Sequence, residues 1–276
     1  MSPAQKERIY PRDPGTGIIL GAEPFEFAPA VRSDNTHAVL FLHGWTSSPR
    51  ELRFVAKRVA EAGFFCRGIL LPGHGRSVQD LAPTDFPDYL AAAETAFDDL
   101  ARDHARVSLC GLSLGGLLCL YLAARRSAAN LVLYAPFLVP GGATFGIPNR
   151  WALRLFGTWL SPDRLLPKTG EGPIFDPASL REHLAYQAMP ARGVLGNFRA
   201  AQAIWRNIPE ISAATLIFQS PLDPTSDAAG AKRLMRELGS GDKRLVEVGR
   251  SKHVITLDLD RSLIEEETVR WLSERR

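Results

Sequence analysis

A serine flanked by glycines is the residue of this chain whose setting most clearly suits chemistry. Residues 111–115 read Gly-Leu-Ser-Leu-Gly, a G-x-S-x-G match centred on Ser113. An apolar segment typical of a strand precedes the match and one typical of a helix follows it, which is the setting of a nucleophile elbow. Glycines there keep side chains out of a strained turn. The sequence therefore predicts a nucleophilic Ser113; the alternative is a plain tight turn with a surface serine.

A serine hydroxyl is a poor nucleophile until a base takes its proton, and two histidines follow Ser113 in the chain. His183 lies in a segment with no strand end to hold it, whereas His253 comes a few residues after the last predicted strand. A loop from the carboxyl end of that strand would reach the same edge of the sheet as Ser113. We therefore predict His253 as the base.

The acid that orients this histidine should follow the preceding strand, because folds with such an elbow place serine, acid and histidine in that chain order. Residues 215–219 read as that strand, and Asp223 lies just beyond them. Asp227 is the second candidate. A lone aspartate in a proline-rich loop is otherwise a turn residue or a helix cap. We predict Asp223 as the third member of the set.

Two backbone N–H groups are needed to hold the negative charge that develops on a carbonyl oxygen under attack. One should belong to Leu114, the residue after the nucleophile. The other should come from the loop after residues 38–42, where we assign it to Trp45. The ring of His43 is expected to hold this loop, although His43 and Gly44 are also candidate substrate contacts.

The elements that must position these residues alternate between strand and helix patterns, which predicts parallel strands joined by crossover helices. Residues 18–27 could add an antiparallel edge strand. The expected strands are residues 38–42, 64–70, 106–110, 131–134, 215–219 and 245–248, and the expected helices are 52–60, one starting near Thr84 and Asp85, 117–126 and one around 264–272.

Residues 137–208 interrupt this alternation and are rich in glycine, proline, arginine and large apolar residues. Long insertions in compact domains are usually functional. We interpret the segment as an inserted, mostly helical cap over the carboxyl edge of the sheet, which leaves 1–136 and 209–276 as the core. The alternative is an ordinary extra helical layer. Trp151, Phe156 and Trp159 of the cap are candidate acyl contacts or, equally, packing residues.

Composition narrows the class of protein. The 276 residues are 45% hydrophobic and 23% charged, which suits one large α/β domain with a full core. A formal net charge of +3 without blocks of like charge argues against a nucleic-acid partner. The three cysteines lie in apolar stretches and are expected to be reduced. A polar N-terminus and the lack of a long apolar segment predict a cytoplasmic protein without stable membrane insertion.

Taken together, the chain resembles the small bacterial carboxylesterases and monoacylglycerol lipases among the α/β-hydrolases. The likeness rests on residues 43–45, the Leu-Pro-Gly-His-Gly segment 71–75, the elbow, Asp223 and residues 253–258, and it weakens in the cap. It implies an α/β-hydrolase fold, a mostly parallel sheet flanked by helices. It also implies cleavage of small-molecule esters with an apolar acyl chain, without a metal or organic cofactor. By the same likeness, His74 is a loop residue near the site.

Two positions depart from that family. Lys252 stands before the histidine where these enzymes commonly have glycine. A cation there would oppose formation of the imidazolium, so we expect its side chain to face solvent. Pro224 directly follows Asp223 and could shift how the loop presents the carboxylate.

The expected reaction is two-step acyl transfer from an ester through Ser113. The same residues could instead serve a thioester, an amide or a carbon–carbon bond, or a ligand receptor that barely turns over. A haloalkane dehalogenase is disfavoured because it needs an aspartate at the elbow. A scaffold without catalysis would have no reason to keep all three residues.

Overall fold

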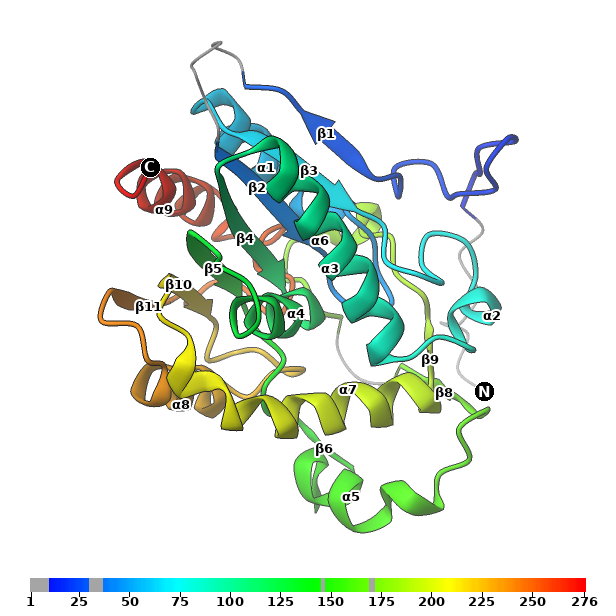
Figure 1. Cartoon of the computed structure of the whole chain (residues 1–276). Coiled ribbons are helices and arrows are strands. Elements are labelled where there is room, and N and C mark those ends of the chain that lie inside the picture. Colours follow the sequence, from blue (N-terminus) through cyan, green and yellow to red (C-terminus); the bar gives the residue numbers. More distant parts are fainter. Residues whose placement is uncertain (1–9, 30–36, 145–146, 169–171) are drawn as a thin grey trace.

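A seven-stranded sheet forms the centre of the structure, a computed structural model that describes residues 10–29, 37–144, 147–168 and 172–276 (Figure 1). The strand order is β1-β3-β2-β4-β5-β10-β11, and only β1 is antiparallel to its neighbour. This confirms the predicted mostly parallel sheet. The strands are β1 (Phe25–Phe27), β2 (His37–Leu42), β3 (Phe65–Ile69), β4 (Arg106–Leu112), β5 (Asn130–Tyr134), β10 (Ala214–Gln219) and β11 (Lys243–Glu247).

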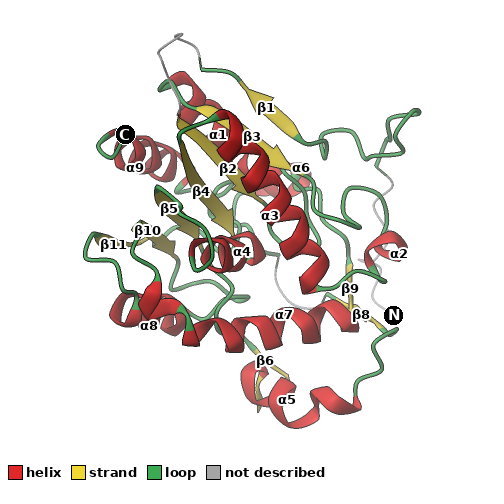
Figure 2. Cartoon of the chain, in the orientation of Figure 1, coloured by secondary structure: helices red, strands yellow, loops and turns green. Residues whose placement is uncertain are grey.

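Helices cover both faces of this sheet (Figure 2). Strand β2 explains why: Leu40 and Leu42 join one apolar cluster, and Val39 and Phe41 join the other. A strand buried on both faces has no polar alternation, so its sequence is a continuous apolar run. The first face is covered by α3 (Phe86–Asp103), α4 (Leu114–Ala123) and α8 (Ala228–Glu237), and the second by α1 (Arg50–Glu61) and α9 (Arg261–Ser273).

Helix α3 begins directly after Thr84 and Asp85, where the sequence predicts the start of a helix. The Asp85 side chain accepts the Asp88 N–H and the Asp88 side chain accepts the Asp85 N–H, which together form a capping box. The Asp85 side chain also accepts the Phe86 N–H. The buried face of α3 carries Leu90 and Phe97, and the opposite face is polar. Within the described ranges, no helix combines the length and the apolar character needed to cross a bilayer.

The cysteines carry no disulfide and no exposed thiol. Cys66, Cys110 and Cys119 are free and buried on β3, β4 and α4. Burial raises the pKa of all three thiols well above the ordinary value, which makes them unreactive.

The turn between β4 and α4 packs backbones more closely than side chains would allow. A Cβ on Gly111 would lie 2.3 Å from the carbonyl carbon of Gly115, and one on Gly115 would lie 1.8 Å from the carbonyl oxygen of Leu42. Glycine is therefore required at both positions. Helix α4 starts at Leu114, earlier than the predicted start at residue 117, because the turn itself occupies only Ser113.

The segment between β5 and β10 is a mixture of short helices and small sheets. Helices α5 and α7 lie at one end of the sheet in Figure 1, and two antiparallel strand pairs accompany them, which the sequence did not predict. The division into a core and a cap at residues 137–208 stays a prediction. Its elements are β6 (Ala143–Thr144), β7 (Ile147–Pro148), α5 (Asn149–Phe156), η1 (Gly157–Trp159), β8 (Leu165–Pro167), α6 (Pro177–Glu182), β9 (Ala188–Pro190), α7 (Ala191–Ala203) and η2 (Ile204–Arg206).

The close approach at the elbow predicts the effect of one methyl group. Gly115→Ala should lower the free energy of unfolding by about 3 kcal/mol or more, because the Leu42 backbone cannot move aside without disturbing β2. Gly241→Ala is the matched control, since a Cβ there meets nothing within 4 Å, and its effect should stay within about 0.5 kcal/mol. Urea unfolding measures both, and equal midpoints for the two variants would contradict the packing argument.

Candidate active site

Ser113 sits alone in the turn between β4 and α4, in a conformation that few residues adopt. Its φ is +53° and its ψ is −112°. The Ser113 N–H donates to the carbonyl oxygen of Tyr134 at 2.9 Å, which fixes the turn to strand β5. Strained backbone of this kind is held in place by its surroundings and clusters at functional sites. Here the strain turns the hydroxyl out at the carboxyl end of the sheet.

The structure brings the three residues predicted as a set into one chain of hydrogen bonds. Ser113 Oγ lies 2.9 Å from His253 Nε2, and His253 Nδ1 lies 2.7 Å from Asp223 Oδ2. The side chain of Asp223 is fully buried and that of His253 is nearly so. This geometry lets the serine hydroxyl donate to the imidazole while the opposite ring N–H donates to the carboxylate.

The loop after β10 holds the Asp223 carboxylate firmly despite Pro224. Its Oδ1 accepts the N–H groups of Thr225 at 2.7 Å and Ser226 at 2.9 Å, which leaves Oδ2 for the histidine. Asp227, the second candidate acid, caps helix α8 instead by accepting the Ala229 N–H, and it pairs with Arg150.

The loop that carries His253 is fixed from both sides. The N–H groups of His253 and Val254 both donate to the carbonyl oxygen of Pro173, and the Asp258 carboxylate accepts the Lys252 N–H at 2.8 Å. The prediction that the Lys252 side chain faces solvent is wrong. Only 9% of Lys252 is exposed, because its ammonium lies over the ring of Phe175, 4.5 Å from the ring centre.

The loop after β2 presents one free N–H between two occupied ones. The Gly44 N–H donates to Glu51 Oε2 and the Thr46 N–H donates to His74 Nε2, each at 3.0 Å. Among the described residues, neither Trp45 N–H nor Leu114 N–H has a hydrogen-bond partner. Leu114 opens helix α4, where the first N–H groups have no partner within the helix. Both predicted oxyanion donors are thus available.

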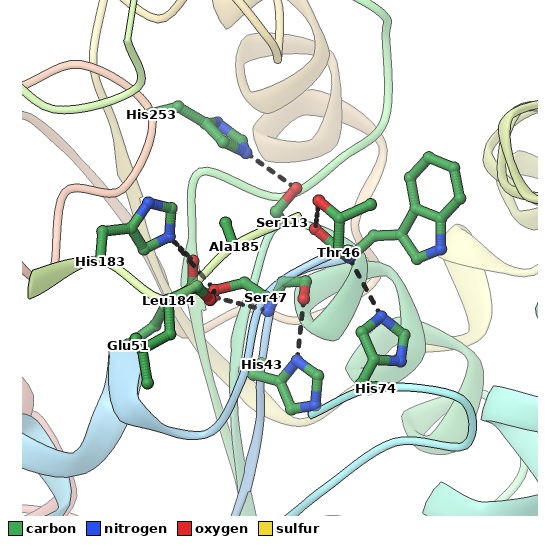
Figure 3. A network of polar contacts seen from close by, with 12 residues as sticks. His43, Thr46, Ser47, Glu51, His74, Ser113, His183, Leu184, Ala185 and His253 are labelled. Carbon is green, nitrogen blue, oxygen red and sulfur yellow. Dashed lines mark hydrogen bonds and ion pairs between the residues drawn. The ribbon is translucent and has the colours of Figure 1, made fainter. Parts of the chain in front are cut away.

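Two buried histidines hold this loop from below (Figure 3). His43 is fully buried; its Nδ1 donates to the Gly44 carbonyl oxygen and its Nε2 accepts the Leu71 N–H. His74 likewise donates to Pro72 and accepts from Thr46. Burial lowers the pKa of His43 and brings that of His74 to about 3, so both rings are neutral. His43 therefore has no ring nitrogen left for a substrate.

A buried acid that sequence reasoning missed completes the support of the loop. Glu51 Oε1 lies 2.8 Å from Nε2 of His183, the histidine set aside as a base, and Ser47 Oγ is 3.1 Å from the same nitrogen (Figure 3). Burial opposes ionisation, but the hydrogen bond and charge of His183 outweigh it and lower the pKa of Glu51. The signal was a glutamate on the apolar face of a helix, in line with Val55 and Val59.

Of the cap residues predicted to contact the acyl chain, Trp151 lines a cavity and Trp159 does not. Trp151 borders a cavity of about 470 Å³ whose wall also includes Phe198 and Trp205, and whose lining does not include Ser113. Trp159 is 88% exposed. Phe156 ends helix α5, and its side chain lies outside the described part of the structure.

No group of three or more His, Cys, Asp or Glu side chains within the described ranges is placed to hold a metal ion. The prediction that the reaction needs no metal or organic cofactor stays a prediction.

A parallel sheet with a strained serine at a glycine-lined elbow, hydrogen-bonded to a histidine and an acid from later loops, defines the α/β-hydrolase class. The profile of the Hydrolase_4 family, described as serine aminopeptidase S33, matches residues 33–260. The chain belongs to this family, and it is an α/β-hydrolase of the lipase and esterase type.

Individual relatives cover almost the whole chain. A thermostable monoacylglycerol lipase of Bacillus sp. (strain H-257) is 29% identical over 93% of this chain and 96% of its own length. A carboxylesterase of Bacillus subtilis (strain 168) is 24% identical over 93% of this chain and 98% of its own. A structure from work on the metagenome-derived lipolytic enzymes LipS and LipT superimposes with a TM-score of 0.80 at 26% identity, over 93% of this chain and 99% of that one.

The Glu51–His183 pair predicts a pH-dependent contribution to stability. Because the folded state lowers the pKa of Glu51, its charge stabilises the fold above the unfolded-state pKa, and this contribution is lost as the pH falls through the folded-state pKa. Glu51→Gln should cost about 1–3 kcal/mol at pH 7 and progressively less from about pH 5 downward. Glu61→Gln, an exposed change on the same helix, is the control. The free energy of unfolding is measured by urea unfolding at a series of pH values. If it changes with pH in the same way for the wild type and for Glu51→Gln, this role is contradicted.

Proposed function

We propose that this protein hydrolyses carboxylic esters through an acyl-enzyme on Ser113, with His253 as the base and Asp223 as the orienting acid. The observation that carries the proposal is the continuous chain of hydrogen bonds from Ser113 Oγ through the imidazole to the buried carboxylate. A tight turn with a surface serine would have no need of a histidine and a buried acid in line.

In the first step Ser113 Oγ attacks the ester carbonyl carbon while His253 Nε2 takes the hydroxyl proton. The carbonyl oxygen becomes an oxyanion, which accepts from the free N–H groups of Trp45 and Leu114. Collapse of the tetrahedral intermediate breaks the bond to the leaving alcohol, which receives the proton from His253. Water then attacks the acyl-enzyme by the same route, releasing the carboxylic acid and restoring the serine.

The substrate class follows from the relatives and from the cap. Two relatives with nearly full coverage are named a monoacylglycerol lipase and a carboxylesterase, which favours short- to medium-chain esters or monoacylglycerols. The cavity beside Trp151 has aromatic side chains in its wall, which could contact an acyl chain, together with the arginines Arg150, Arg154 and Arg233. The family description names aminopeptidases, so amides are the alternative substrate that the experiments must include.

Substitution of the catalytic residues is the first test. Ser113→Ala should lower kcat on p-nitrophenyl butyrate by about 10⁴-fold or more, and Asp223→Asn by about 10⁴-fold, because the histidine loses its orienting acceptor. Asp227→Asn is the matched control: it alters a neighbouring aspartate that caps α8, and kcat should change less than about threefold. Steady-state kinetics measure kcat of each variant, and mass spectrometry of the protein labelled with a fluorophosphonate identifies the reactive serine. Label on another serine, or full activity of Ser113→Ala, would overturn the proposal.

A wild type that acylates once and stalls would favour a ligand receptor. Faster turnover of an amino-acid p-nitroanilide or an acyl thioester than of any ester would favour the other acyl hydrolases.

The length of the acyl chain provides a second test, which addresses the cap. On the hypothesis that the cavity bordered by Trp151 receives the far end of a long acyl chain, Trp151→Ala should raise KM for p-nitrophenyl decanoate by about tenfold and leave that for the acetate nearly unchanged. Leu155→Ala, an exposed apolar change on the same helix, is the control. Equal effects of Trp151→Ala on KM for both esters would show that the acyl pocket lies elsewhere. Monoacylglycerols are compared in the same assay.

A further inference from the structure

Thr46, the residue after the oxyanion donor Trp45, adopts a backbone conformation that its side chain disfavours. Its φ is +63°, although it is β-branched and only 2% exposed. A β-branched residue in this region is a true outlier, and such strain persists only where the surroundings over-determine it. The φ of Thr46 orients the Trp45–Thr46 peptide, whose carbonyl also accepts the Thr46 hydroxyl. Whatever fixes Thr46 therefore restrains Trp45 from its carboxyl side, next to the Cα that bears the Trp45 N–H.

Four hydrogen bonds use every polar group of Thr46. Its N–H donates to His74 Nε2 at 3.0 Å, and its hydroxyl donates to the Trp45 carbonyl oxygen at 2.5 Å. The other two bonds come from the cap: its carbonyl oxygen accepts the Tyr186 N–H at 2.9 Å, and its Oγ1 accepts from Lys168 Nζ at 2.5 Å. The cap thus supplies half of the bonds that hold the strained residue.

Lys168 is itself placed by the cap's own small sheet. It directly follows β8, which pairs with β9, and its N–H donates to the Gln187 carbonyl oxygen at 2.9 Å. Lys168 follows β8 and Tyr186 shortly precedes β9, so the two residues that contact Thr46 adjoin the two strands of one pair. A shift of that strand pair would move both contacts together.

We propose that Lys168 is a positioning residue for ester hydrolysis, whose ammonium holds Thr46 and thereby aims the Trp45 N–H at the oxyanion. The inference rests on the proposed function. The ammonium also places a positive charge within the oxyanion loop, where it favours the negative charge of the transition state more than it favours the uncharged ester. Its effect should accordingly fall on kcat and leave KM nearly unchanged.

The ionisable groups around Lys168 allow its charge to be titrated separately. Burial lowers the pKa of Lys168 to about 8, against the opposing charge of Glu51 from α1. Glu51, whose charge acts on Lys168, has a lowered pKa and stays ionised. Of the two ionisable residues that also bond to Thr46, His74 is neutral above about pH 3, and the pKa of Tyr186 is raised to about 12. His183 lies beyond Glu51. Raising the pH through 8 therefore removes the charge of Lys168 and leaves those of Glu51, His74 and Tyr186 unchanged.

The test compares Lys168→Met with Arg192→Met, which removes an exposed cap cation paired with Asp163. Lys168→Met should lower kcat on p-nitrophenyl butyrate by about 10- to 100-fold, less than deletion of an oxyanion donor, with KM within about twofold. The inhibition constant of an alkyl trifluoromethyl ketone, which forms the oxyanion adduct, should rise by the same factor. After subtraction of spontaneous hydrolysis, wild-type kcat should fall above about pH 8, and this fall should be absent in Lys168→Met. Arg192→Met should behave as wild type.

Lys168→Gln guards against simple misfolding, because it keeps a donor for Thr46 without the charge. Thermal unfolding and circular dichroism show whether each variant is folded. The inference is overturned if folded Lys168→Met or Lys168→Gln keeps the alkaline fall, or if Lys168→Met changes KM and not kcat.

A second measurement distinguishes failure of the proposed ester hydrolysis from failure of the proposed role of Lys168. If the wild type hydrolyses no ester, the second-order rate of Ser113 labelling by a fluorophosphonate still reports the oxyanion loop. That rate should drop about 10-fold or more in Lys168→Met, and equal labelling of both proteins would refute the role of Lys168.

Discussion

The contact between the Gly115 position and the carbonyl oxygen of Leu42 is the constraint on which the rest of the site depends. It draws the start of α4 against the end of β2, closer than any side chain allows. Ser113 is consequently pressed into a positive φ at the edge of the sheet. The same approach sets the first N–H of α4 beside the loop that carries Trp45. One steric requirement thus gathers Ser113, the proposed nucleophile, and the two proposed oxyanion donors, Trp45 and Leu114.

Asp223 and His253, the proposed acid and base, reach this point because β10 lies beside β5 in the sheet order and β11 lies beside β10. Their loops end at the same edge as the elbow, and each is fixed by buried carboxylates. Asp223 receives two backbone N–H groups, and Asp258 and Asp260 receive those around His253. Preorganised loops of this kind need little rearrangement when charge develops, which is the usual source of electrostatic catalysis.

The core elements and Ser113 at the elbow could be predicted from sequence because each rests on a local signal, and Asp223 and His253 followed from their places after the later strands. Strand 38–42 is a continuous apolar run, α3 has its capping box, and the elbow has its glycines. Contacts between the cap and the oxyanion loop have no such signal. Lys168 and His183 meet residues more than a hundred positions away, and nothing in their neighbours encodes that. The burial of Lys252 has no signal in the sequence either, because it depends on Phe175, which is distant along the chain.

The bond from the Tyr186 N–H to the Thr46 carbonyl oxygen has a consequence for the evolution and engineering of this protein. A main-chain bond does not depend on side-chain identity, so many sequences can occupy the cap while its backbone keeps the same path. A foreign cap grafted onto this core would have to follow the same backbone path and carry a cation at the position of Lys168. Otherwise residues 44–51 would have to be replaced as well. On the proposed roles of Lys168 and Thr46, the two segments form one exchangeable module, so that a transplanted cap would have to bring its own oxyanion loop.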